Sequence, residues 1–216
     1  CSDILEGKPV ESRRYDVIFD RECQPDLFGV FGSMYSGKSA KDGVNPMKDK
    51  LGTQIADARL TLSDSPLLSE GFGYTLFDAE GMATKTLPLI ENGELKSFLH
   101  NSYTARALNT VSTGSAVRSY NSSPGVGSLA LSLIPGSMTQ EKLIESIQEG
   151  ILIQGVAGLH SGVNPISGDF SVGAEGIQIR NGQLSEPVRE ITIASTLQRM
   201  LLEVQDIGSD LERLPM

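Results

Sequence analysis

The chain has 216 residues, a mass of 23.1 kDa and 39% hydrophobic residues, which is enough for one sizeable core. A formal charge of −9 and a pI near 4.7 argue against nucleic acid as a direct ligand, because phosphate binding depends on lysine and arginine. Two cysteines exclude a disulfide framework, and no apolar run approaches the roughly 20 residues of a membrane helix, so we expect a cytoplasmic protein without membrane contact.

The first third of the chain predicts a strand, a helix and a second strand. Residues 15–19 (YDVIF) are typical of a short strand, and Pro25 is well placed in the first turn of a helix. The apolar face of that helix carries Leu27, Phe28 and Phe31. Residues 33–50 are polar and rich in turn formers, and residues 55–62 predict the second strand.

A tight hairpin is the clearest element of the middle of the chain. Residues 87–90 and 94–99 flank Asn92-Gly93, a pair that tolerates the positive φ angles of a type I′ turn. A short helix is expected over residues 102–108, and residues 110–127 form a loop rich in glycine, serine and asparagine.

The last third predicts two helices on either side of a second hairpin. Ser137 and Gln140 form a capping box, and a helical apolar face follows that reaches Ile151. The hairpin pairs residues 176–180 with 183–188 around Asn181-Gly182, and a strand over 190–194 follows. A second capping box then opens the last helix. Its two capping residues are Ser195 and Gln198, its core face carries Leu197, Met200, Leu201 and Val204, and Gly208 is its expected stop.

These elements predict an α+β fold with antiparallel β-hairpins and a few separate helices, because strands and helices do not alternate regularly. Both hairpins contain Ile-x-Asn-Gly-x-Leu, at residues 90–95 and 179–184, and a helix follows each. The shared motif indicates either an internal duplication or the common requirements of two tight turns, and we favour the second interpretation.

A phosphate-binding loop is one candidate for chemistry. Residues 32–39 (GSMYSGKS) match G-x-x-x-x-G-K-[ST], in which Lys38 would neutralise phosphate. The motif also needs a preceding strand and a helix that starts at the lysine, whereas Gly43 and Pro46 interrupt the chain soon afterwards. A polar loop that matches by chance is therefore the favoured interpretation.

Metal and acid–base chemistry have few candidates. His100 and His160 are far apart in the sequence, and neither has a second histidine or a cysteine nearby, so each is more typical of a structural or surface residue than of a ligand. Asp78 and Glu80 could act as an acid–base pair, but a turn held by the Asp78 side chain is the favoured alternative. Ser112 and Ser115 are interpreted as turn formers.

Glycine is densest over residues 158–190, where polar residues are sparse. Gly162 and Gly168 would let another backbone approach Asp169 closely. Asp169 therefore has two interpretations: it contacts a ligand, or it caps neighbouring amides within a loop, which we favour.

Three blocks taken together carry a resemblance. They are FDAEGMATKTLPLIENGELKSFLHNSYTARAL, STGSA and GVNPISGDFSVGAEGIQIRNGQLSEPVREITIA. In this order they resemble the C-terminal half of the TldD/PmbA family, in particular its PmbA (TldE) branch, over about residues 15–212. The resemblance implies the fold of a TldD/PmbA C-terminal domain. It also leads us to expect that residues 1–216 are a single C-terminal-type domain of a longer protein, without its N-terminal domain and last C-terminal segment.

In that family, the TldD branch is a zinc-dependent peptidase whose metal is held by a helical H-E-x-x-x-H and a later cysteine. The corresponding helix here reads LFGVFGSMYSG, without histidine or glutamate. The resemblance therefore implies no catalytic residue, metal ligand or cofactor in this chain, and it places zinc in a TldD-like partner.

The expected function is that of a non-catalytic partner subunit, in a heterodimer with a TldD-like subunit or in a homodimer. The complex would cleave small or unfolded peptides and leader peptides. Two alternatives remain: a non-proteolytic interaction protein that modulates DNA gyrase or a toxin–antitoxin system, and an independent hydrolase that uses the Lys38 loop or the Asp78 and Glu80 pair. The candidate contacts with a peptide or a partner are His160, Asp169, Phe170, Tyr103 and Arg106.

Overall fold

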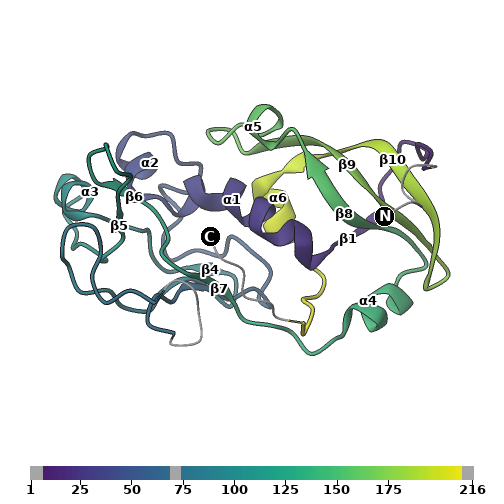
Figure 1. The fold of residues 1–216 in the computed structure, drawn as a ribbon, viewed down its shortest axis with the longest axis horizontal. Helices are drawn as coiled ribbons and strands as arrows, with labels where there is room; N and C mark the ends of the chain where they lie inside the picture. Colours follow the sequence, from purple (N-terminus) through teal and green to yellow (C-terminus); the bar gives the residue numbers. More distant parts are fainter. Residues whose placement is uncertain (1–6, 69–73, 211–216) are drawn as a thin grey trace.

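The computed structural model describes residues 7–68 and 74–210, and it confirms the predicted α+β class (Figure 1). One four-stranded sheet has the order β1-β8-β9-β10, a second has the order β4-β3-β2-β7, and β5 and β6 form a two-stranded ribbon. In Figure 1 the first sheet lies at the right, and the ribbon lies at the left end together with two short helices.

The first sheet contains the longest strands. β1 (Asp16–Phe19) is parallel to β8 (Glu149–Ala157), and β9 (Asp169–Arg180) is antiparallel to both β8 and β10 (Gln183–Thr196). The second predicted hairpin is confirmed, since β9 and β10 join at Asn181-Gly182 with φ angles of 49° and 73°. Its arms are longer than predicted, because the register shifts in β10 without ending the strand.

The second sheet contains the first predicted hairpin, which is also confirmed. β3 (Leu87–Glu91) pairs with β4 (Glu94–Leu95) around Asn92-Gly93, whose φ angles are 49° and 80°. β2 (Leu62–Asp64) lies between β3 and β7 (Leu131–Leu133).

The predicted strand over residues 55–62 is wrong, because only Leu62 belongs to a strand. The amides of Ile55 and Ala56 both donate to the carbonyl of Gly93, at 2.9 and 3.0 Å, so this segment wraps around the hairpin turn and forms no ladder. Ile55, Ala56, Leu60 and Leu62 are buried nevertheless. Apolar residues are thus buried here without strand pairing.

The first helices follow β1 directly. A short 3-10 helix, η2 (Arg21–Cys23), leads into α1 (Gln24–Tyr35), with Pro25 in its first turn as predicted. The stretch over residues 33–50 is not a single loop, since it contains the end of α1 and α2 (Gly37–Lys41). α3 (Ser102–Ala107) confirms the predicted helix over residues 102–108. The predicted loop over residues 110–127 contains the ribbon strands β5 (Ala116–Val117) and β6 (Gly125–Val126).

The helix predicted to reach Ile151 is shorter than expected. α4 (Gln140–Ser146) is capped by Thr139, whose hydroxyl accepts the amide of Lys142, and not by Ser137. Ile151 instead lies in β8, opposite Val17 of β1 and Gln178 of β9. The sheet therefore overrides the helical spacing, because strands on both sides of β8 satisfy its backbone.

Two further helices cover the sheets. α5 (Leu159–Gly162) is one turn inside the glycine-dense segment, and α6 (Leu197–Leu202) follows β10. The predicted cap of α6 is wrong by one residue, since Thr196 accepts the amide of Arg199, and the helix ends before Gly208. No helix in the described ranges is long and apolar enough to cross a membrane.

The main core lies where α1 and α6 meet the second sheet and the start of β9. Its most deeply buried members include Phe31, Met34, Leu89, Phe170 and Leu197. A smaller buried cluster, which includes Cys23, Ile151 and Ile153, packs on the first sheet. Because α1 lies between the two sheets, its remaining surface faces the space that separates them.

Candidate functional site

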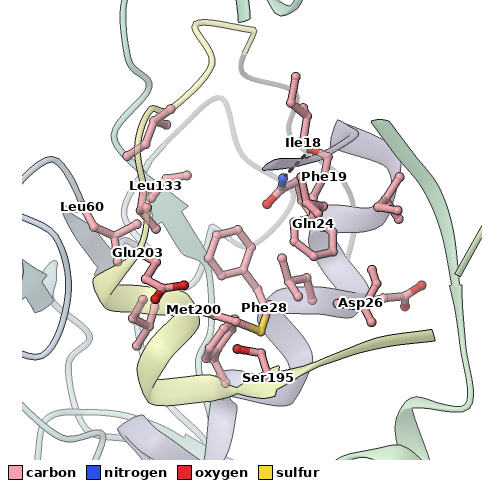
Figure 2. Close-up of a pocket in the computed structure, with 18 of the residues that line it drawn as sticks. Ile18, Phe19, Gln24, Asp26, Phe28, Leu60, Leu133, Ser195, Met200 and Glu203 are labelled. Carbon is pink, nitrogen blue, oxygen red and sulfur yellow. Dashed lines mark hydrogen bonds between the residues drawn. The ribbon is translucent and has the colours of Figure 1, made fainter. Parts of the chain in front are cut away.

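A groove of about 2450 Å³ runs between α1, α6, β7 and the first sheet. Figure 2 shows Phe28 of α1, Met200 of α6, Leu60 and Leu133 among the residues that line it. These side chains pack against the core on one side, yet Phe28, Leu133 and Met200 are only partly buried. A contiguous apolar surface of this kind is typical of a site that binds a ligand or another chain.

Three strand edges face this groove. Residues 15–19, 129–133 and 190–195 line it without interruption. Since successive side chains of a strand point to opposite faces, an unbroken run of lining residues means that the edge of the strand faces the groove. β1 and β10 are the two edges of the first sheet, and β7 is an edge of the second. The groove is therefore shaped to receive an extended backbone.

At one residue, the outer edge of β1 presents backbone groups that are not used in the described sheet. The amide of Asp20 donates to the carbonyl of Ile153 in β8 at 2.9 Å, so strand alternation directs the backbone groups of Val17 and Phe19 away from β8. The carbonyl of Phe19 already accepts Nε2 of Gln24 at 3.1 Å (Figure 2). Within residues 7–68 and 74–210 the backbone N–H and C=O of Val17 thus have no partner, and they can bind a further strand.

Ion pairs line the rim of the groove. Arg13 pairs with Glu149, and Glu203 is held by Arg14 at 3.2 Å and by Arg199 at 2.7 Å. The hydrogen bond from Arg199 lowers the pKa of Glu203. Because these charges are paired and exposed, they contribute little to stability and leave the apolar floor as the main recognition surface.

The residues of the predicted phosphate loop contact other parts of the protein. The ammonium of Lys38 pairs with Asp42 at 2.8 Å, and the hydroxyl of Ser36 caps α2. Gly37 packs against the ring of His100, and α1 occupies the place where a phosphate loop needs a strand. The geometry therefore supports the favoured interpretation of a chance match.

The two histidines have different environments. His100 is buried, its Nδ1 lies 3.1 Å from the hydroxyl of Thr104, and burial lowers its pKa. His160 is exposed on α5. No group of three or more His, Cys, Asp or Glu side chains that could hold a metal occurs within residues 7–68 and 74–210.

Asp78 and Glu80 both bind backbone. The carboxylate of Asp78 is buried and accepts the amides of Glu80, Met82 and Ala116 at 2.9 to 3.0 Å. Glu80 accepts the amide and hydroxyl of Ser102 at the start of α3, both at 2.8 Å. These contacts agree with the favoured turn, and they leave neither carboxylate free for acid–base work.

The five predicted contact residues do not form one site. His160 and Asp169 are exposed at α5 and β9, and the Asp169 carboxylate accepts the hydroxyl of Ser167 at 2.7 Å. Phe170 is 1% exposed and belongs to the core, so its side chain offers no free surface for the predicted contact. Tyr103 and Arg106 are exposed on α3, which Figure 1 places at the left end.

Sequence reasoning missed the groove, since none of these five residues lines it. The available signal was the predicted apolar face of α1, which carries Leu27, Phe28 and Phe31. In the structure Leu27 and Phe31 are buried there, while Phe28 faces the groove.

Comparisons with known proteins identify the relatives of this chain. Residues 12–215 match the family model described as the PmbA/TldA metallopeptidase C-terminal domain. The chain is 33% identical over 208 residues to the metalloprotease PmbA of Escherichia coli O157:H7, covering 96% of this chain and 44% of that protein. It is 32% identical to a metalloprotease of Methanothermobacter thermautotrophicus, covering 96% and 45%.

Solved structures agree with these relatives. A protein from Thermotoga maritima, named as a proposed modulator of a DNA gyrase, superposes with a TM-score of 0.91 at 32% identity, covering 99% of this chain and 49% of that one. TldE from Thermococcus kodakarensis superposes with a TM-score of 0.85 at 26% identity, covering 97% and 48%. The chain spans less than half the length of each of these proteins. It belongs to the PmbA/TldD metallopeptidase family and corresponds to that family's C-terminal domain.

Proposed function

We propose that this chain is the C-terminal domain of a non-catalytic subunit that holds an extended peptide for a zinc-bearing TldD-like partner. The observation that carries the proposal is the open outer edge of β1, which faces an apolar groove. The chain spans less than half the length of its curated relatives, so we also propose that it works within a longer protein.

The metal of the family does not fit the residues of α1. Under the family resemblance, α1 corresponds to the helix that carries H-E-x-x-x-H in zinc-binding members. The α1 residues that line the groove include one carboxylate, Asp26, but no histidine, cysteine or second carboxylate, so α1 lacks the set of ligands that zinc requires. In the proposed complex the partner supplies zinc and its chemistry, whereas this chain supplies binding.

The edge of β1 would bind the peptide through its main chain. Val17 offers one N–H and one C=O, and an added strand would place alternate side chains against Phe28, Leu133 and Met200. Because backbone groups do not distinguish sequences, such a site accepts many peptides that are small or unfolded and carry apolar side chains. It excludes folded proteins, whose strands are already paired.

A substitution at Gly32 tests whether the groove is used. Gly32 lines the groove, and an added Cβ would meet no atom within 4 Å, so α1 accommodates a larger side chain there. The full-length protein is co-purified with its TldD-like partner, and cleavage of an unfolded peptide is measured. We expect Gly32→Trp to reduce cleavage at least about tenfold, because the indole occupies peptide space, whereas Gly32→Ala retains it.

Two outcomes would contradict the proposal. The first is full cleavage by the partner alone, which would remove the need for this subunit. The second is stoichiometric zinc in the purified protein together with cleavage in the absence of a partner, which would make it an enzyme in its own right.

The name given to the Thermotoga maritima relative favours a second candidate, an interaction protein that modulates DNA gyrase. The net charge of −9 disfavours an effect through direct DNA contact, so this role would require contact with gyrase itself. Binding to purified gyrase and a change in its supercoiling activity, both in the absence of the TldD-like subunit, would support this candidate over the first.

A further inference from the structure

A long segment of this acidic protein contains no acidic residue. Over residues 95–140 the chain carries three basic residues and not one aspartate or glutamate. The rest of the chain therefore holds 15 basic and 27 acidic residues. The segment supplies α3 and the ribbon strands β5 and β6, which gather at the left end of Figure 1. We refer to the exposed surface of this segment around α3 as the α3 face.

Large side chains are exposed on the α3 face. Tyr103 is 64% exposed, Val111 is 74% exposed, and Tyr120 is fully exposed. A shallow hollow of about 500 Å³ borders α3 and the loop after it, and it is lined by Ala105, Arg106 and, from an earlier segment, Met82. An exposed tyrosine on a helix that borders a hollow, together with an arginine at the margin of that hollow, is typical of a protein interface.

Among the described residues, two of the three basic residues of the segment have no acidic partner, whereas Lys96 pairs with Glu94 at 2.9 Å. Arg106 and Arg118 are exposed, and neither forms an ion pair with any residue in the described ranges. The ammonium of Lys41 lies 5.3 Å from the centre of the Tyr103 ring. The acidic groups nearby have other partners: Asp42 pairs with Lys38 and Lys41, and Glu80 binds the start of α3.

We propose that the α3 face docks an acidic surface of the catalytic subunit, with an apolar side chain of that subunit in the hollow. The inference rests on the proposed function, because it takes the catalytic subunit as the occupant. Charge complementarity favours an acidic partner. Most of this chain is acidic and would repel an acidic surface, whereas the α3 face would not. A nucleic acid is disfavoured, because two unpaired arginines neutralise too few phosphates for stable binding.

Charge reversal tests the proposal. We compare two double variants. The test variant is Arg106→Glu/Arg118→Glu, and the control is Lys8→Glu/Lys142→Glu, which changes the net charge by the same amount at exposed lysines outside the segment. The Kd of each full-length variant for the TldD-like subunit is measured by titration calorimetry at two salt concentrations. We expect the arginine variant to raise the Kd at least about tenfold and to reduce its salt dependence, and the lysine variant to change it less than about threefold.

Each outcome decides a different point. If the arginine variant binds the TldD-like subunit with unchanged affinity, the proposed docking at the α3 face is wrong and the proposed function stands. If wild type forms no complex with that subunit, both proposals are wrong. Single-stranded DNA binding that the arginine variant abolishes would assign the face to nucleic acid and overturn the proposal. Tyr103→Ala provides a variant of unchanged charge, and we expect it to raise the Kd about fivefold or more without lowering thermal stability.

Discussion

Gly37 lies directly against the imidazole ring of His100, so closely that a methyl group added to residue 37 would overlap the ring and the backbone carbonyl of Leu99. The amide of Gly37 donates to that same carbonyl at 2.8 Å. The contact joins α2 to the segment after the first hairpin. It also explains a glycine that otherwise matches a phosphate-loop motif.

Replacing this glycine will destabilise the protein. We expect Gly37→Ala to lower the free energy of unfolding by about 1–3 kcal/mol, because the added methyl group forces either His100 or Leu99 to move. Gly29→Ala is the control, since an added Cβ at residue 29 meets no atom within 4 Å and α1 gains helix propensity of about 0.5–1 kcal/mol. Urea denaturation of both variants measures these effects. Equal stabilities would contradict the packing described for Gly37.

The Asp78 carboxylate holds the turn before the first hairpin to β5. It is buried and accepts three amides, so we expect Asp78→Ala to cost about 3 kcal/mol of stability. Glu80→Ala removes an exposed contact to the start of α3 and should cost about 0.5–1 kcal/mol. Thermal unfolding distinguishes the two variants. Cleavage that falls in Asp78→Ala while its stability remains unchanged would revive the acid–base hypothesis.

His100 makes stability depend on pH. Burial lowers its pKa below the unfolded value of about 6.5, so the unfolded state binds the proton more readily. Its contribution to stability is therefore present above about pH 6.5 and is lost as the pH falls through the folded pKa. We expect wild type to lose more stability than His100→Gln between pH 7.5 and pH 5. Parallel losses in the two proteins, measured by urea denaturation at each pH, would show that His100 does not titrate in this way.

Cys23 should be chemically inert in the folded protein. Burial in the smaller core cluster raises its pKa to about 11, and its Sγ lies 3.6 Å from the carbonyl of Ile153. A thiol of this kind is almost entirely protonated at pH 8 and hardly reacts as a nucleophile. In a Cys1→Ser variant we expect iodoacetamide to label residue 23 only after unfolding in urea. Rapid labelling of the native protein, followed by mass spectrometry, would contradict this burial.

Features that depend on local chemistry could be predicted from the sequence. Both hairpins turn at Asn-Gly, where asparagine and glycine adopt the positive φ angles that the turn requires. Pro25 marked the start of α1 for a similarly local reason.

The errors arose where distant segments decide the structure. Ile151 follows a helical spacing, yet it lies in a strand between β1 and β9. β1 comes much earlier in the sequence and β9 comes later, so the local spacing does not reveal either neighbour. Ile55 belongs to a segment that wraps around the turn at Gly93. The groove could not be predicted for the same reason, because residues from five separate parts of the chain form its walls.

The open edge of β1 is the central claim, and Val17→Pro tests it most directly. Proline at Val17 removes the N–H that points away from β8, while Asp16 and Ile18 keep their ladder contacts with β8. Binding of an unfolded apolar peptide to the full-length protein is measured by fluorescence anisotropy, with Val17→Ala as control. We predict at least about tenfold weaker binding for Val17→Pro and nearly unchanged binding for Val17→Ala at equal thermal stability. Equal affinity of a folded Val17→Pro variant and wild type would contradict strand addition at this edge.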